Sequence, residues 1–172
     1  MLKNIIKRWV TPFWILLSMT GMGVGAFLIG TVLEVYGHFP ACILCHTERF
    51  LFLIGGAISF LTWIWRKEIL GQLLCIALGL VWSVGSGVGF YHAGIQYHLF
   101  DKPSFCHVQE VAGDSLDSQL ANFLAEPSAS CDQRTLDIFS IPASLYIGFA
   151  LLFCVGWTVF CFRKMHHGRL FL

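Results

Sequence analysis

The chain has 172 residues, of which 56% are apolar and only 12% are charged. Soluble domains usually carry about 25% charged residues, so this composition points to a protein embedded in a lipid bilayer. The formal net charge of +1 argues against a nucleic-acid partner, because no basic surface is available to meet phosphates. The length allows several membrane helices and one extramembrane segment, and we expect a single integral-membrane domain over residues 1–172.

Four uncharged runs predict four transmembrane helices, at about 13–33, 42–65, 70–94 and 141–162. The first run is long enough to cross a bilayer core of about 30 Å, and it is too long for a cleaved signal peptide. The third run exceeds one crossing, so its helix is expected to end between Tyr91 and Gln96. Pro142 falls in the first turn of the fourth helix, where proline is tolerated. The expected fold is an all-α, four-helix membrane bundle.

Two polar loops, at about 34–41 and 97–138, lie on one side of this bundle. Within the longer loop, residues 114–126 place apolar side chains on one helical stripe. This stripe predicts either a helix lying on the membrane or a small helix packed on the loop.

The distribution of Lys and Arg predicts the orientation. Most of them fall on the side that carries both termini and the turn near residue 66, namely Lys3, Lys7, Arg8, Arg66, Lys67, Arg163, Lys164 and Arg169. The positive-inside rule makes that side cytoplasmic. Four cysteines (Cys42, Cys45, Cys106 and Cys131) then fall on the outer side, where disulfides persist.

The stretch from Pro40 to Arg49 contains the main candidate site. Cys42 and Cys45 are separated by two residues, which puts their sulfurs about one helical turn apart on one face. The free amides of a first helical turn favour a thiolate and so lower the pKa of a cysteine. Arg49 follows Cys45 by four residues, so the same face carries a cation one turn deeper.

Four outer cysteines allow three disulfide connectivities. Close spacing favours Cys42 with Cys45, which leaves Cys106 with Cys131. A bridge in the long loop would be worth a few kcal/mol as a structural staple. A bridge between Cys42 and Cys45 would constrain almost nothing in a helix, so that pair is better explained as redox-active. The other three cysteines, Cys75, Cys154 and Cys161, are predicted to be packing residues.

A disulfide at the membrane surface can be regenerated by passing two electrons to an apolar acceptor in the bilayer, and a quinone is the simplest such acceptor. Cys45 would donate the electrons, and Arg49 would stabilise both the thiolate and the negative charge that develops on the quinone. Alternatively, Arg49 snorkels and pairs with Glu48 or a lipid phosphate. His92 could bond a quinone oxygen or supply a proton, or it could simply be satisfied within the bundle.

Zinc is the main metallic alternative, since several histidines lie near the same face. The spacing lacks the usual second close pair of ligands, so we expect no metal site.

The motifs together resemble the DsbB family of bacterial disulfide bond formation proteins, over essentially the whole chain. The resemblance rests on Pro-x-Cys-x-x-Cys-x-x-Glu-Arg at 40–49, Tyr-His-x-Gly-Ile-Gln at 91–96 and Pro-x-x-Cys at 103–106, followed by Cys131 and Pro142. It implies a multi-pass protein of the bacterial inner membrane, with both termini cytoplasmic and with the redox cysteines and the long loop between helices 3 and 4 in the periplasm.

The resemblance also implies a path for electrons. A soluble thioredoxin-like partner of the DsbA type would be oxidised by Cys106 and Cys131, with Cys106 forming the mixed disulfide. Electrons would pass to Cys42 and Cys45 and then to a bound quinone, ubiquinone or menaquinone, with Cys45 nearest the ring and Arg49 beside it.

Two alternatives stay open. A vitamin K epoxide reductase-like enzyme shares the bundle, but that class usually places the paired cysteines in a late helix. A non-enzymatic tetraspan protein would use its loop disulfide as a staple, with Cys42 and Cys45 inert.

Overall fold

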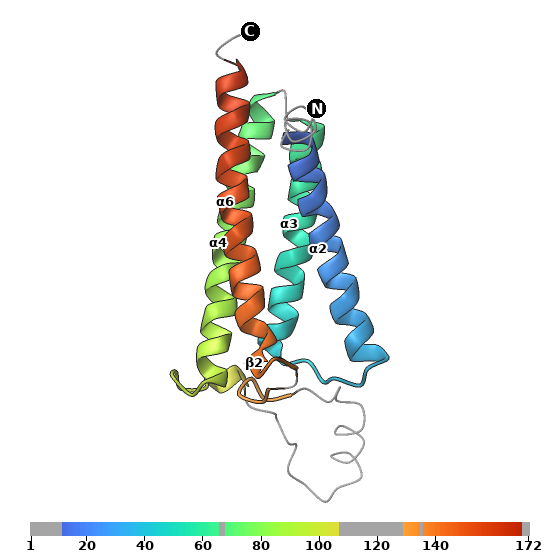
Figure 1. Ribbon diagram of the computed structural model, residues 1–172, viewed down its shortest axis with the longest axis vertical. Helices are drawn as coiled ribbons and strands as arrows, with labels where there is room; N and C mark the ends of the chain where they lie inside the picture. Colours follow the sequence, from blue (N-terminus) through green and yellow to red (C-terminus); the bar gives the residue numbers. More distant parts are fainter. Residues whose placement is uncertain (1–11, 66–67, 107–128, 135, 170–172) are drawn as a thin grey trace, which may run out of the picture.

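The computed structural model describes residues 12–65, 68–106, 129–134 and 136–169. Four long helices run side by side along the molecule (Figure 1): α2 (Pro12–Val35), α3 (Ile43–Ile64), α4 (Ile69–Gln96) and α6 (Ala143–Arg169). Each contains a stretch that is long and apolar enough to cross a membrane. The predicted four-helix membrane bundle is therefore confirmed.

The helices approach one another closely at glycines. A Cβ added to Gly23 of α2 would lie 2.8 Å from the Cα of Gly56 on α3, and one added to Gly89 of α4 would lie 2.9 Å from the Cα of Gly148 on α6. No side chain could move aside there, because the opposing atoms are backbone. Small residues of this kind let membrane helices pack backbone to backbone.

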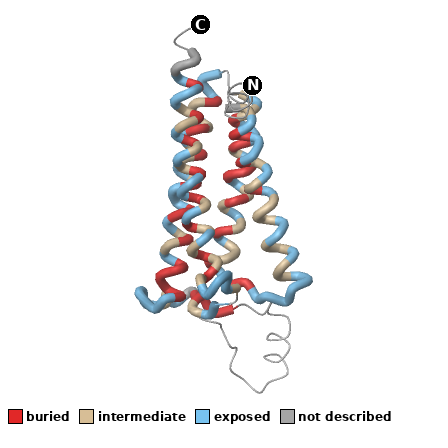
Figure 2. Tube along the Cα trace, viewed as in Figure 1, coloured by how far each residue is buried: buried red, intermediate tan, exposed pale blue. Residues whose placement is uncertain are grey.

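Buried residues alternate with exposed ones along the four helices (Figure 2), and the fully buried core includes Leu16, Leu78, Trp82 and Leu151. Cys75, Cys154 and Cys161 belong to this core, in agreement with their predicted packing role. The outward faces are also apolar: Ile29 is 63% exposed and Leu80 is 64% exposed. Apolar residues on both faces are what lipid contact requires, because no water has to be met.

The cysteine end of the bundle is the end where α2 and α4 finish and α3 and α6 begin; it lies at the bottom of Figure 1. It also carries the short helix η1 (Ser104–Cys106) and a two-stranded antiparallel ribbon of β1 (Asp137–Ile138) and β2 (Ile141–Pro142). Phe139 and Ser140 turn the ribbon, with φ of 53° and 63°. Such a two-residue turn needs two left-handed residues to match the twist of its strands.

This ribbon corrects one detail of the sequence analysis. Pro142 lies in β2 and not in the first turn of a helix, because Ile138 pairs with Ile141 and the chain enters α6 only at Ala143. The amide of Ala143 donates to the carbonyl of Leu136 across the ribbon, at 3.1 Å.

Two further points concern the loops. Glu34, expected in the first loop, lies in the last turn of α2, which continues to Val35. The amphipathic stretch at 114–126 lies outside the described residues, so that expectation stays a prediction.

Candidate functional site at the cysteine end

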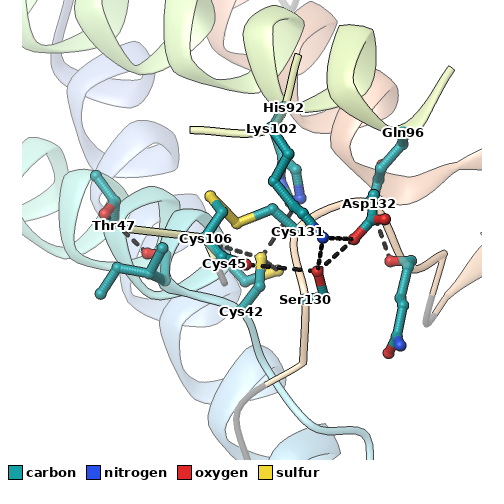
Figure 3. The surroundings of a disulfide bond; sticks show 12 residues. Cys42, Cys45, Thr47, His92, Gln96, Lys102, Cys106, Ser130, Cys131 and Asp132 are labelled. Carbon is teal, nitrogen blue, oxygen red and sulfur yellow. Dashed lines mark hydrogen bonds and ion pairs between the residues drawn. A yellow bond between two sulfur atoms is a disulfide. The ribbon is translucent and has the colours of Figure 1, made fainter. Parts of the chain in front are cut away.

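Cys42 is the N-cap residue of α3 and faces Cys45 one turn on (Figure 3). The two are free thiols with their sulfurs 2.8 Å apart, and the Cys45 amide donates to the Cys42 sulfur at 3.3 Å. An N-cap side chain normally accepts from an amide of the first turn, and here the acceptor is a sulfur. The start of α3 therefore places an amide of its first turn at the Cys42 sulfur.

The same contacts determine which cysteine ionises first. A hydrogen bond from the Cys45 thiol lowers the pKa of Cys42; burial opposes this, and the backbone amide of Cys45 reinforces it, so that the pKa lies below the ordinary value. The sequence predicted a favoured thiolate at this helix mouth without choosing between the two cysteines. The structure assigns it to Cys42.

His92 of α4 connects this pair to a buried carboxylate. Its Nε2 lies 3.4 Å from the Cys42 sulfur and its Nδ1 lies 2.9 Å from Glu48 Oε1 on α3. The His92 and Glu48 side chains are 2% and 3% exposed. The sequence analysis named His92 and missed Glu48 as a site residue, although Glu48 follows Cys45 by three positions and so shares its face.

Arg49 points the other way, toward α2. Its guanidinium donates to Glu34 Oε2, and His46 Nε2 lies 3.3 Å from Glu34 Oε1. The alternative pairing of Arg49 with Glu48 is wrong, because successive residues are about 100° apart on a helix and the two side chains face different neighbours. Room for Arg49 beside α2 comes from Gly30, where an added Cβ would lie 2.6 Å from the Arg49 Nε.

A cavity of about 220 Å³ opens beside these groups. Its walls are largely apolar, and the polar side chains that reach it include Cys45, Arg49, His92 and Gln96. An apolar cavity with a few convergent polar groups suits a flat, mostly apolar molecule with polar oxygens. Cys45 and Arg49 both line this cavity.

Cys106 and Cys131 form a disulfide, as the sequence analysis favoured, with their Cα atoms 5.5 Å apart. Both are buried, at 3% and 0% exposed, in one cluster with Cys42 and with Cys45 packed against it. Figure 3 shows the disulfide next to the Cys42 thiol. The structure thus brings all four predicted redox cysteines into one buried cluster.

The segment 129–134 is tied down on both sides of Cys131. Lys102 Nζ donates to Ser130 Oγ at 3.0 Å and lies 3.4 Å from Asp132 Oδ1, and Ser130 also donates to Asp132. This Ser130 hydroxyl lowers the pKa of Asp132, with a further contribution from Lys102.

On the other side, Gln96 joins three elements. Its side chain accepts from Ser144 Oγ of α6 at 2.5 Å and donates to the Gln133 carbonyl at 3.4 Å. Arg134 Nε donates to the Gln96 carbonyl at 3.3 Å and the guanidinium covers the Tyr97 ring. The sequence analysis missed these supports, because each links residues far apart in the chain.

Cys42, Cys45 and His92 present three potential metal ligands within 4.8 Å of one another. The two sulfurs, however, are 2.8 Å apart. Sulfurs that share a tetrahedral zinc at about 2.3 Å lie about 3.8 Å apart. The trio therefore fits a dithiol ready to close better than a zinc site.

Comparison with known proteins gives one family. The family model described as disulfide bond formation protein DsbB matches residues 11–161. No curated protein and no solved structure gives a match.

Proposed function

The chain belongs to the DsbB family, and we propose that it is a membrane thiol:quinone oxidoreductase that reoxidises a soluble DsbA-type dithiol partner. Membership in the family implies disulfide-bond formation in a membrane. The observation that carries the finer proposal is the single buried cluster of Cys42, Cys106 and Cys131, beside a cavity that Cys45 and Arg49 line.

The two cysteines of the α3 mouth have different surroundings, which gives them different roles. Cys42 packs with the Cys106–Cys131 disulfide and is the cysteine that exchanges with the loop pair. Cys45 lines the cavity and is the cysteine that faces the electron acceptor. In the direction of the proposed electron flow, a thiolate of the loop pair attacks Cys42 in its disulfide with Cys45, and Cys42 later leaves the mixed disulfide as a thiolate. The lowered pKa of Cys42 favours this departure, because a thiol of lower pKa is the better leaving group.

Each turnover moves two electrons and two protons from the partner's dithiol to the acceptor. A bound quinone supplies the two-electron, two-proton acceptor, ubiquinone or menaquinone. Arg49 holds a positive charge at the cavity wall, where it stabilises negative charge on a ligand oxygen in a low-dielectric site. His92, between the dithiol and Glu48, holds or returns a proton.

The partner must reach a disulfide that is buried in this structure. Cys106 is expected to form the mixed disulfide, and this requires segment 129–134 to leave its contacts with Lys102 and Gln96. Ala129 and Cys131 also hold the segment in the buried cluster, but its contacts with Lys102 are polar and partly exposed, and contacts of this kind open more readily than buried apolar ones.

We also propose the orientation and location. The cysteine end faces the periplasm of a bacterial inner membrane, with both termini in the cytoplasm. Arg163 and Lys164 at the far end of α6 support this assignment, because membrane proteins retain basic residues on the cytoplasmic side.

The test is quinone-dependent oxidation of a reduced DsbA-type partner by the purified protein, followed by thiol counting. Cys45→Ser is expected to abolish oxidation and Arg49→Ala to slow it at least tenfold, while Cys154→Ala keeps near wild-type activity. If the wild type oxidises no partner with either ubiquinone or menaquinone and its loop disulfide stays intact, the proposal fails and a stapled tetraspan protein is the better account.

A further inference from the structure

We propose that Glu48 is a positioning residue that holds His92 as the base for the Cys42 thiol. The inference rests on the proposed function, since it assigns a proton acceptor to Cys42, which must lose its proton when the acceptor takes two electrons and the Cys42–Cys45 disulfide forms again. It concerns Glu48, which belongs to the Pro-x-Cys-x-x-Cys-x-x-Glu-Arg motif but was given no role in the site from the sequence.

The geometry is a chain of three groups from two helices. Cys42 Sγ lies 3.4 Å from His92 Nε2, and His92 Nδ1 lies 2.9 Å from Glu48 Oε1. An ionised carboxylate can only accept hydrogen bonds, so Nδ1 must carry the hydrogen. In the neutral ring Nε2 is then the acceptor, and its lone pair faces the Cys42 sulfur. A nucleophile, a base and a group that orients the base are arranged in the same order in many enzymes with activated thiols.

Burial keeps the His92–Glu48 pair in one geometry. Both side chains of the pair line the cavity but are at most 3% exposed, so little of the carboxylate or the ring is open to water. Among the described residues the hydrogen-bonding partner of Glu48 is His92, since Arg49 faces Glu34 on α2. A buried carboxylate that loses its partner is strongly destabilised, so the pair is held together in one geometry.

The position of His92 between the other two groups is essential. The negative charge of Glu48 by itself raises the pKa of Cys42, so a direct effect of Glu48 would disfavour the thiolate. Acting through His92, Glu48 favours the thiolate. When the Cys42 proton moves to His92, an imidazolium forms, and the adjacent carboxylate of Glu48 stabilises it. The titratable groups that face the His92 ring are Cys42, Cys45 and Glu48.

Proton transfer from Cys42 to His92 needs no cofactor. The Cys42 S–H bond breaks, the proton passes to Nε2, and the electron pair stays on sulfur as the thiolate. His92 becomes an imidazolium that donates from Nδ1 to Glu48. When Cys42 is later released as a thiolate, the same proton can return to it.

The first test reads the histidine directly. Reduced full-length protein with ¹⁵N-labelled histidine is compared with Glu48→Gln and Glu48→Leu by NMR above the pH at which the ring titrates. We expect the wild type to show a single Nδ1–H form. Glu48→Gln is expected to show both tautomers, because an amide can donate or accept, and Glu48→Leu is expected to lose the preference. The matched control is Glu34→Gln, which changes a carboxylate in the last turn of α2 that faces Arg49 and His46, and it should leave the His92 ring unchanged.

The second test reads the thiol. In a background with serine at 45, 106 and 131, the alkylation rate of Cys42 is followed against pH by peptide mass spectrometry. We expect the rate at pH 7 to fall about tenfold in Glu48→Leu and several-fold in Glu48→Gln, with the midpoint moved to higher pH, whereas Glu34→Gln keeps the wild-type profile. Glu48→Gln has nearly the size of the native residue, so it tests the proposal even if Glu48→Leu does not fold.

Unchanged tautomer and unchanged thiol profile in Glu48→Gln would overturn the proposal. A purely structural role would lower thermal stability in this variant without moving either readout. Because neither readout uses a quinone or a partner protein, the inference about Glu48 and the proposed oxidoreductase activity can fail separately.

Discussion

Two groups of cysteines in this chain are almost equally buried and have very different surroundings. At the cysteine end, Cys42 and Cys131 are 3% and 0% exposed, and in the core Cys75 and Cys161 are 1% and 0% exposed. Cys42 contacts a ring nitrogen, a backbone amide and a second thiol. Cys75 has a weak contact with the Thr158 carbonyl at 3.6 Å. Burial alone therefore says little about reactivity, and the polar neighbours decide it.

The difference follows from position along the helices. At the middle of a membrane helix every amide is already bonded within the helix, so a cysteine there meets carbonyls and apolar side chains. At a helix start the first amides are unpaired, and polar side chains of neighbouring helices can also reach the site. A reactive cysteine in a bundle of this kind is thus expected at a helix mouth.

The sharpest test of this contrast replaces one cysteine from each group. Cys131→Ser is expected to reduce quinone-dependent oxidation of the partner more than a hundredfold, since the loop disulfide cannot form. Cys161→Ala, at an equally buried position, is expected to stay within about twofold of wild type. Partner thiols counted over time measure both. A comparable loss in Cys161→Ala, with the fold intact, would show that the core cysteines also take part.

The thiols themselves provide the next test. In the fully reduced protein, a small membrane-permeant alkylating reagent at pH 7 should modify Cys42 more than tenfold faster than Cys161. The reason is that the pKa of Cys42 is lowered, so its thiolate fraction is present at lower pH and decreases only as pH falls through that lowered value. Peptide mass spectrometry gives both rates at matched burial. Equal rates would remove the distinction between the two groups.

A smaller effect is expected from Gly30→Ala. The added Cβ would lie 2.6 Å from the Arg49 Nε and displace the side chain, which is flexible enough to yield partly. We expect the KM for quinone to rise about three- to tenfold with little change in folding. Gly25→Ala, where no atom lies within 4 Å of the new Cβ, is the matched control and should be neutral. A rise in both variants would mean that α2 as a whole, and not Arg49, sets the affinity.

The smallest effect concerns the exposed support of the loop. Asp132→Asn weakens the contacts with Lys102 and Ser130, and since Asp132 is near the surface we expect Tm to fall by about 1–3 °C at pH 7. The pKa of Asp132 is lowered in the folded protein. Its stabilising contribution is therefore present above the ordinary value near 3.9 and is lost as pH falls through the folded value. Thermal melts at pH 7 and pH 3 should show the difference between variant and wild type shrinking in acid.

Much of the fold could be predicted from sequence, because each membrane helix is encoded locally by an uncharged run of sufficient length. The paired cysteines, Arg49 and His92 could be named for the same reason, since helical spacing and residue chemistry are local. Their proposed roles still depend on the experiments above.

The ribbon before α6 could not be predicted. Its strands have two residues each, and its turn uses Phe139 and Ser140 where glycine or asparagine is the usual signal. The partners of the polar side chains could not be predicted either: Glu34 meets Arg49, and Gln96 meets Ser144, only after the helices pack. Glu48 was the exception, because its spacing from Cys45 was available in the sequence.

The burial of the Cys106–Cys131 disulfide has a consequence for selectivity. A thiolate must approach a disulfide along the line of the two sulfurs, and here both sulfurs are enclosed by protein. Small thiols in the surrounding solution are then kept from reducing the pair, whatever their reduction potential. A protein that binds the cysteine end and displaces segment 129–134 gains access that no small molecule has. Access to the disulfide thus depends on which reductant can displace segment 129–134.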